Sequence, residues 1–152
     1  MTATLLVLHL GALLFGGGFA VAADRGTRAA ARDSDAEVST QMRARQLVAL
    51  AELHPLVMRA LWISIASGLA LFALHAERYV TSGVFWVKMA LVVALLANGL
   101  VMQIAERDAR EASPSAIGAG AAAVWGRLRA SAVASTALWA LVLVAGVLLT
   151  YR

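Results

Sequence analysis

The chain has 152 residues, of which 61% are hydrophobic, 14% are charged and none is cysteine. Soluble domains have about 45–50% apolar and about 25% charged residues, so this composition excludes an ordinary soluble domain, and it also excludes a disordered chain. Without cysteine there is no disulfide, thiolate metal site, iron–sulfur cluster or covalently attached haem. The net charge is +4, but the placement of the charges indicates a lipid bilayer rather than nucleic acid as the partner.

Charged residues leave four long apolar stretches. Asp, Glu, Lys and Arg are absent from residues 1–23, 60–76, 89–105 and 130–151. A bilayer core about 30 Å thick needs about 20 apolar residues in a helix. The alternating segments of about ten residues that build a membrane β-barrel are absent. We therefore predict an all-α integral membrane four-helix bundle with up-down-up-down topology. This single transmembrane domain (1–152) has spans at about 3–23, 56–76, 84–105 and 130–150.

Basic residues predict the orientation of these spans. The connections at about 24–55 and 106–129 lie on one side of the membrane and carry most of the arginines, namely Arg25, Arg28, Arg32, Arg43, Arg45, Arg107, Arg110, Arg127 and Arg129. Because basic loops stay in the cytoplasm, we expect both termini outside, in the periplasm of a bacterial inner membrane. The motif at 20–22 (Ala-Val-Ala) is typical of a signal-peptidase site, but no basic segment precedes it, so we expect an uncleaved span.

The first connection contains a helix signal of its own. Residues 34–37 (Ser-Asp-Ala-Glu) fit a capping box, which predicts a helix over about 35–53. This helix is either a short interfacial one, with a new helix opening near Pro55, or a continuous cytoplasmic extension of the second span. The second connection, near 75–82, is short. Spans two and three are therefore expected to be antiparallel neighbours.

Polar side chains inside the spans are the candidates for function, because burying them in hydrocarbon is costly. His9 lies about 8 Å below the outer end of span one at about 1.5 Å per residue. Lys88 lies at a similar depth in span three, and His75 closes span two on the same outer side. We expect these three residues to converge, whereas His54 belongs to the opposite end. Asn98 is expected to bond another helix.

Several roles remain open for the three outer residues. His9 either forms an interhelical hydrogen bond, ligates haem iron or another metal, or transfers a proton. His75 is either an interfacial residue or a second ligand. Lys88 either extends to the outer surface or pairs with an acidic group such as a porphyrin propionate.

Two glycines share helix faces with the outer histidines. Gly16 follows His9 by seven residues and Gly68 precedes His75 by seven, a step that returns to nearly the same face. A glycine there either leaves room for a flat macrocycle or allows two helices to pack closely.

These segments resemble the HemJ/CopD-like group of small bacterial membrane proteins. Residues 8–11 (Leu-His-Leu-Gly) with Gly16 resemble the first span of that group, and residues 82–92, with Lys88 opening an aliphatic span, resemble its third. Residues 67–72 and 98–100 are similar to uncharacterised members of the group. The resemblance implies a haem b-binding membrane protein that oxidises protoporphyrinogen IX, with His9 and Lys88 at the positions of the family's histidine and lysine.

The sequence therefore predicts a b-type haem or porphyrin site in the outer half of the bundle, built from His9, His75, Lys88, Gly16 and Gly68. His9 is the expected axial ligand, and the expected activity is electron transfer or porphyrin oxidation. Two alternatives stay open. One is a non-catalytic membrane subunit or assembly factor that binds partner helices or a second copy. The other is a small copper-type metal-ion permease.

Overall fold

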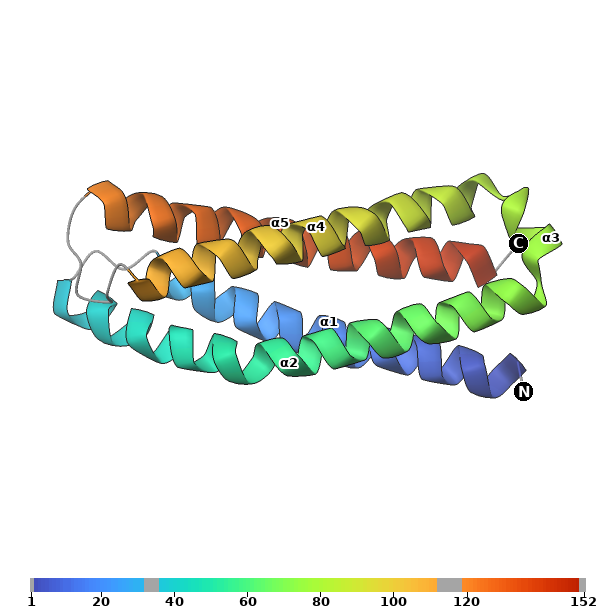
Figure 1. Cartoon of the computed structure of the whole chain (residues 1–152), viewed down its shortest axis with the longest axis horizontal. Coiled ribbons are helices and arrows are strands. Elements are labelled where there is room, and N and C mark those ends of the chain that lie inside the picture. Colours follow the sequence, from blue (N-terminus) through green and yellow to red (C-terminus); the bar gives the residue numbers. More distant parts are fainter. Residues whose placement is uncertain (1, 32–35, 112–118, 151–152) are drawn as a thin grey trace.

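The computed structural model describes residues 2–31, 36–111 and 119–150. Four long helices run antiparallel in an up-down-up-down bundle, with both termini at one end (Figure 1). They are α1 (Thr2–Ala30), α2 (Ala36–Leu74), α4 (Gly83–Glu111) and α5 (Ala119–Thr150), and a short α3 (Ala76–Val80) links α2 to α4. All four long helices are apolar and long enough to cross a bilayer. The predicted all-α membrane four-helix bundle is confirmed.

The helices continue well beyond the predicted spans. α2 has 39 residues, or about 58 Å at about 1.5 Å per residue, which is nearly twice a bilayer core. α1 runs through Asp24 to Ala30, and α2 includes Pro55 in its interior. Of the two possibilities for the first connection, the continuous extension of span two is thus confirmed. The capping-box residues Ser34 and Asp35 lie outside the described residues.

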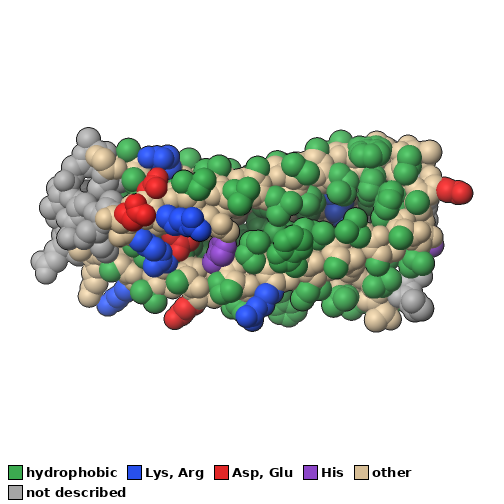
Figure 2. Space-filling model, in the orientation of Figure 1, with side chains coloured by type: hydrophobic (Ala, Val, Ile, Leu, Met, Phe, Trp, Pro, Cys, Tyr) green, Lys and Arg blue, Asp and Glu red, His purple; other side chains and the backbone are tan. Residues whose placement is uncertain are grey.

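The long helices pack around two separate hydrophobic cores. In the apolar half, a core gathers around Leu13, Leu61 and Trp139. Toward the opposite end, where charged side chains gather (Figure 2), a second core gathers around Leu47, Trp125 and Leu128. The helical extensions therefore pack against one another instead of forming loose connections. We call this the basic end of the bundle and the other the His9 end.

The bundle is open along one seam. α1 packs on α2, α4 packs on α5, and α1 packs on α5, whereas α2 and α4 make few direct contacts. Figure 2 shows the hollow between them. The short connection does make α2 and α4 antiparallel neighbours, but their facing sides do not close onto each other. This seam contains both cavities described below.

A buried amide joins α1 to α2 at the basic end. The Gln46 side chain is 8% exposed, and its Nε2 donates to the Ala23 carbonyl oxygen at 2.9 Å and to Thr27 Oγ1 at 3.0 Å. Gly26 makes this possible, because a Cβ there would overlap the Gln46 amide. Two interhelical hydrogen bonds thus fix the register of α1 against α2.

Replacing Gln46 with leucine is expected to lower the free energy of unfolding by about 1–3 kcal/mol, because two buried interhelical hydrogen bonds are lost and each contributes about 0.5–1.5 kcal/mol. Thermal unfolding of the detergent-solubilised protein, followed by circular dichroism, measures this loss. Gln41 on the same helix is exposed, so Gln41→Leu is the matched control and should leave the unfolding temperature nearly unchanged. Equal effects of the two substitutions would contradict the role given to Gln46.

Candidate functional site

His9 and Lys88 meet inside the bundle, as the sequence predicts. Lys88 Nζ lies 3.3 Å from His9 Nε2, although the two residues are 79 positions apart. Lys88 also reaches across to α5, where its Nζ would lie 3.5 Å from a Cβ added at Gly146. The pair therefore connects α1 to α4 beside the seam where α2 and α4 make few direct contacts.

The surroundings of the imidazole define its tautomer. His9 Nδ1 lies 2.8 Å from the backbone carbonyl oxygen of Ser64, which can only accept a hydrogen bond. Nδ1 therefore carries the proton, with the hydroxyl of Ser67 at 3.2 Å beside it. In the neutral ring this leaves the lone pair on Nε2, which accepts from the Lys88 ammonium. The interhelical hydrogen bond considered for His9 is thus present.

An elongated cleft extends along the seam from this pair. Its volume is about 640 Å³, within the range of about 300–1,000 Å³ that small-molecule sites occupy. The walls are almost entirely apolar, and Phe72, Tyr79, Phe85 and Trp86 gather at the α2–α3–α4 turn beside it. His9, Lys88 and Ser64 supply polar groups within this apolar wall. We call this space the His9 cleft.

The other predicted residues separate into two groups. His75 and Gly68 also line the His9 cleft, but the His75 side chain is exposed, and a Cβ at Gly68 would lie 3.1 Å from His9 Cε1. Gly68 thus makes room for the imidazole itself. Gly16 is not part of the cleft, because a Cβ there would lie 2.9 Å from Ala60 Cβ and 3.4 Å from the Trp139 ring. Of the two readings of Gly16, its position corresponds to close helix packing.

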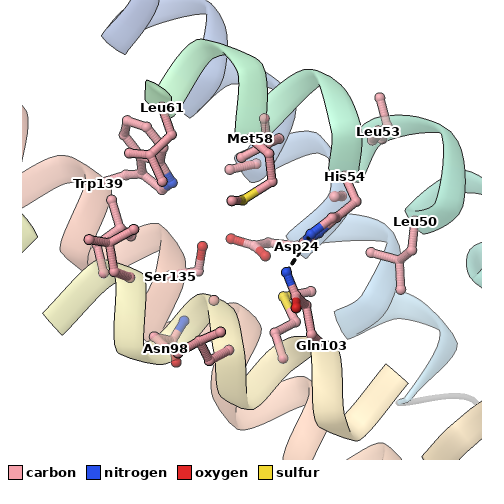
Figure 3. A pocket seen from close by; sticks show the side chains of 18 of the residues that line it. Asp24, Leu50, Leu53, His54, Met58, Leu61, Asn98, Gln103, Ser135 and Trp139 are labelled. Carbon is pink, nitrogen blue, oxygen red and sulfur yellow. Dashed lines mark hydrogen bonds between the residues drawn. The ribbon is translucent and has the colours of Figure 1, made fainter. Parts of the chain in front are cut away.

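A second cavity lies toward the basic end. It has a volume of about 380 Å³ and is lined by all four long helices. Figure 3 shows Asp24 from α1 and Ser135 from α5 directed toward each other within it. His54 from α2 faces Gln103 from α4, with 2.8 Å between their Nε2 atoms. We call this space the Asp24 cavity.

Asp24 is the residue that the sequence interpretation missed. The charge pattern predicts that Asp24 lies in the first connection, because it is the charged residue that ends the apolar stretch at 1–23. The sequence does contain a signal for a continuing helix. Residues 24–31 contain no proline and no glycine pair, and Thr27 lies three positions after Asp24 on a neighbouring helix face. His54 does lie at the end opposite to His9, as expected.

Asn98 bonds another helix, as predicted. Its Nδ2 donates to the Ser131 carbonyl oxygen at 3.0 Å, and Ser131 Oγ donates to Asn98 Oδ1 at 3.1 Å. Within the ranges that the structure covers, no three His, Cys, Asp or Glu side chains come close enough together to hold a metal ion. The chain is thus a multi-pass membrane protein with two separate, mostly apolar cavities along one open seam, each with a few polar side chains in its wall.

Comparison with known protein families, with curated proteins and with solved structures finds no match to this chain.

Proposed function

We propose that the His9 cleft binds a porphyrin, with haem b as the leading candidate. The observation that carries this proposal is the 3.3 Å contact between Lys88 Nζ and His9 Nε2 in the wall of a large apolar cleft. A porphyrin combines a flat apolar ring with two acidic propionates. The aromatic walls suit the ring, and the Lys88 ammonium suits a carboxylate, which a charge-assisted hydrogen bond would hold.

The residues present also fit an iron-containing porphyrin. Histidines that ligate metals commonly donate the other ring N–H to a carbonyl or carboxylate, as His9 Nδ1 does toward Ser64. Nε2 then keeps the lone pair that iron requires. Lys88 occupies this lone pair, so ligation requires the ammonium to move, and a propionate that attracts Lys88 would supply that movement. His75 at the cleft is the candidate second ligand.

A haem held there would supply one-electron redox chemistry. The protein's own contribution would be to orient the imidazole through Ser64, to pair the propionate with Lys88, and to exclude water by the apolar walls. We also propose the orientation: because basic connections stay in the cytoplasm, the arginines of the basic end favour a cytoplasmic location for that end and a periplasmic one for both termini in a bacterial inner membrane. Electron transfer or porphyrin oxidation of the HemJ/CopD-like type is the activity this arrangement favours.

Titration of the purified, detergent-solubilised chain with hemin and with metal-free protoporphyrin IX tests the proposal. We expect both to bind, and we expect Lys88→Gln to weaken both by roughly tenfold or more, because a charge-assisted bond contributes about 1.5–3 kcal/mol. His9→Ala should remove the Soret shift of bound hemin while protoporphyrin still binds.

His54→Ala is the matched control, since it removes an imidazole from the Asp24 cavity and should leave both titrations unchanged. The proposal is wrong if the unmodified chain binds neither porphyrin. Iron ligation by His9 is wrong if the hemin spectrum of His9→Ala equals that of the unmodified chain.

A further inference from the structure

Asp24 is a buried carboxylate on the wall of a cavity. The residue is 1% exposed. Thr136 Oγ1 donates to its Oδ2 at 2.9 Å, and the Ser135 hydroxyl is a second donor. Among the described residues, no basic side chain forms an ion pair with it. The two hydroxyls from α5 therefore orient the carboxylate without neutralising its charge.

Arg28 lies close to Asp24, yet it does not belong to the cavity. Its Nε donates to the Asp24 backbone carbonyl at 3.2 Å, and its Nη2 lies 3.5 Å from Thr136 Oγ1. Arg28 thus reaches the carboxylate only through Thr136, and it is not among the residues that line the cavity. It supports the ionised form of Asp24 from outside the space that a ligand would fill.

The rest of the cavity wall is apolar or already hydrogen-bonded. His54 and Gln103 bond each other, and the Asn98 amide is engaged with Ser131. Trp62 and Trp139 contribute aromatic surface, and the other side chains are mostly aliphatic or methionine. Within the described residues, Asp24 is the one carboxylate, and no lysine or arginine lines the space.

We propose that the Asp24 cavity binds a monovalent organic cation with an apolar body, such as a protonated amine or a quaternary ammonium ion. A buried carboxylate is stabilised by a positive charge, and apolar walls with tryptophan rings favour a cation that carries hydrocarbon. A bare metal ion is disfavoured, because it requires several oxygen ligands that these walls do not provide.

The experiment compares two molecules of nearly equal shape. Benzyltrimethylammonium carries the charge, and neopentylbenzene is its uncharged carbon analogue. Isothermal titration of the full chain in a neutral detergent should show the cation binding roughly tenfold tighter than the neutral analogue. Asp24→Asn should abolish this preference, because the amide keeps its hydrogen-bonding capacity but has no charge. Glu52→Gln, which removes an exposed carboxylate from α2, should retain it.

A second variant keeps the test independent of the stability of Asp24→Asn. Gly99 lines the cavity, and a Cβ there meets nothing within 4 Å. Gly99→Leu is therefore expected to fold and to fill the cavity, so that binding of the cation is lost. The proposal is overturned if the unmodified chain binds the two molecules equally or not at all. Undiminished binding by Gly99→Leu, or a retained preference in a folded Asp24→Asn, would overturn it as well.

Discussion

Replacing Trp139 with alanine is expected to lower the free energy of unfolding by about 3–5 kcal/mol. The side chain is 3% exposed and packs in the core formed with Leu13, Leu61 and Val142. Its ring also lies over the glycines of α1, since a Cβ added at Gly17 would lie 3.2 Å from Trp139 Cε3. Helix association in a membrane depends on such close packing. Unfolding of the solubilised protein by a denaturing detergent, followed by circular dichroism, measures the loss.

Trp62 provides the matched control for this substitution. Its side chain is 63% exposed, so little of it packs against the rest of the bundle. Trp62→Ala removes the same number of atoms, but it leaves no void in the core, so we expect a change within about 0.5 kcal/mol. If Trp139→Ala were as mild as Trp62→Ala, Trp139 would not be the centre of the core.

The sequence was sufficient to predict the class of fold, because four gaps in the charge pattern translate directly into four spans. It was also sufficient to predict that His9 and Lys88 lie close together. Antiparallel spans with a known order place residues of equal depth at one end, and only one imidazole and one ammonium lie at that depth in spans one and three. Their side-chain contact of 3.3 Å agrees with this reasoning.

The basic end could not be predicted in the same way. The charge pattern indicates where the apolar spans end, but a helix does not end there when its extension can pack against another helix. Trp125 is the best example, because it is 4% exposed in a second core and the Arg43 guanidinium lies 5.3 Å from its ring centroid. Hydropathy alone does not distinguish an arginine in a loop from one that packs on an aromatic ring.

The open seam between α2 and α4 also could not be predicted from the sequence. A short connection fixes two helices as neighbours, but whether their faces close depends on which side chains meet. Leu61 from α2 with Leu95 and Leu96 from α4 line both cavities, so these three side chains form the partition between them. The chain thus separates a histidine–lysine pair at one end from a buried carboxylate at the other by an apolar layer.

Replacing Gly16 with leucine is expected to force α1 away from α2. The added Cβ would lie 2.9 Å from Ala60 Cβ, an atom fixed to the α2 backbone that cannot rotate away, and the Trp139 ring blocks the other side. Overpacking costs about 1–3 kcal/mol, and a side chain of this size at a helix contact should reach the upper part of that range. Because His9 is bonded to Ser64 across the same α1–α2 contact, displacement of α1 should also weaken porphyrin binding in the His9 cleft.

Gly18→Leu is the control two residues away on the same helix. A Cβ at Gly18 meets nothing within 4 Å, so a leucine there extends into lipid and improves the helix propensity. We expect Gly18→Leu to elute as a single folded species in gel filtration, with an unfolding transition at or above that of the unmodified chain. Gly16→Leu should aggregate or unfold at lower denaturant. Indistinguishable behaviour of the two variants would mean that α1 does not depend on glycine for its contact with α2.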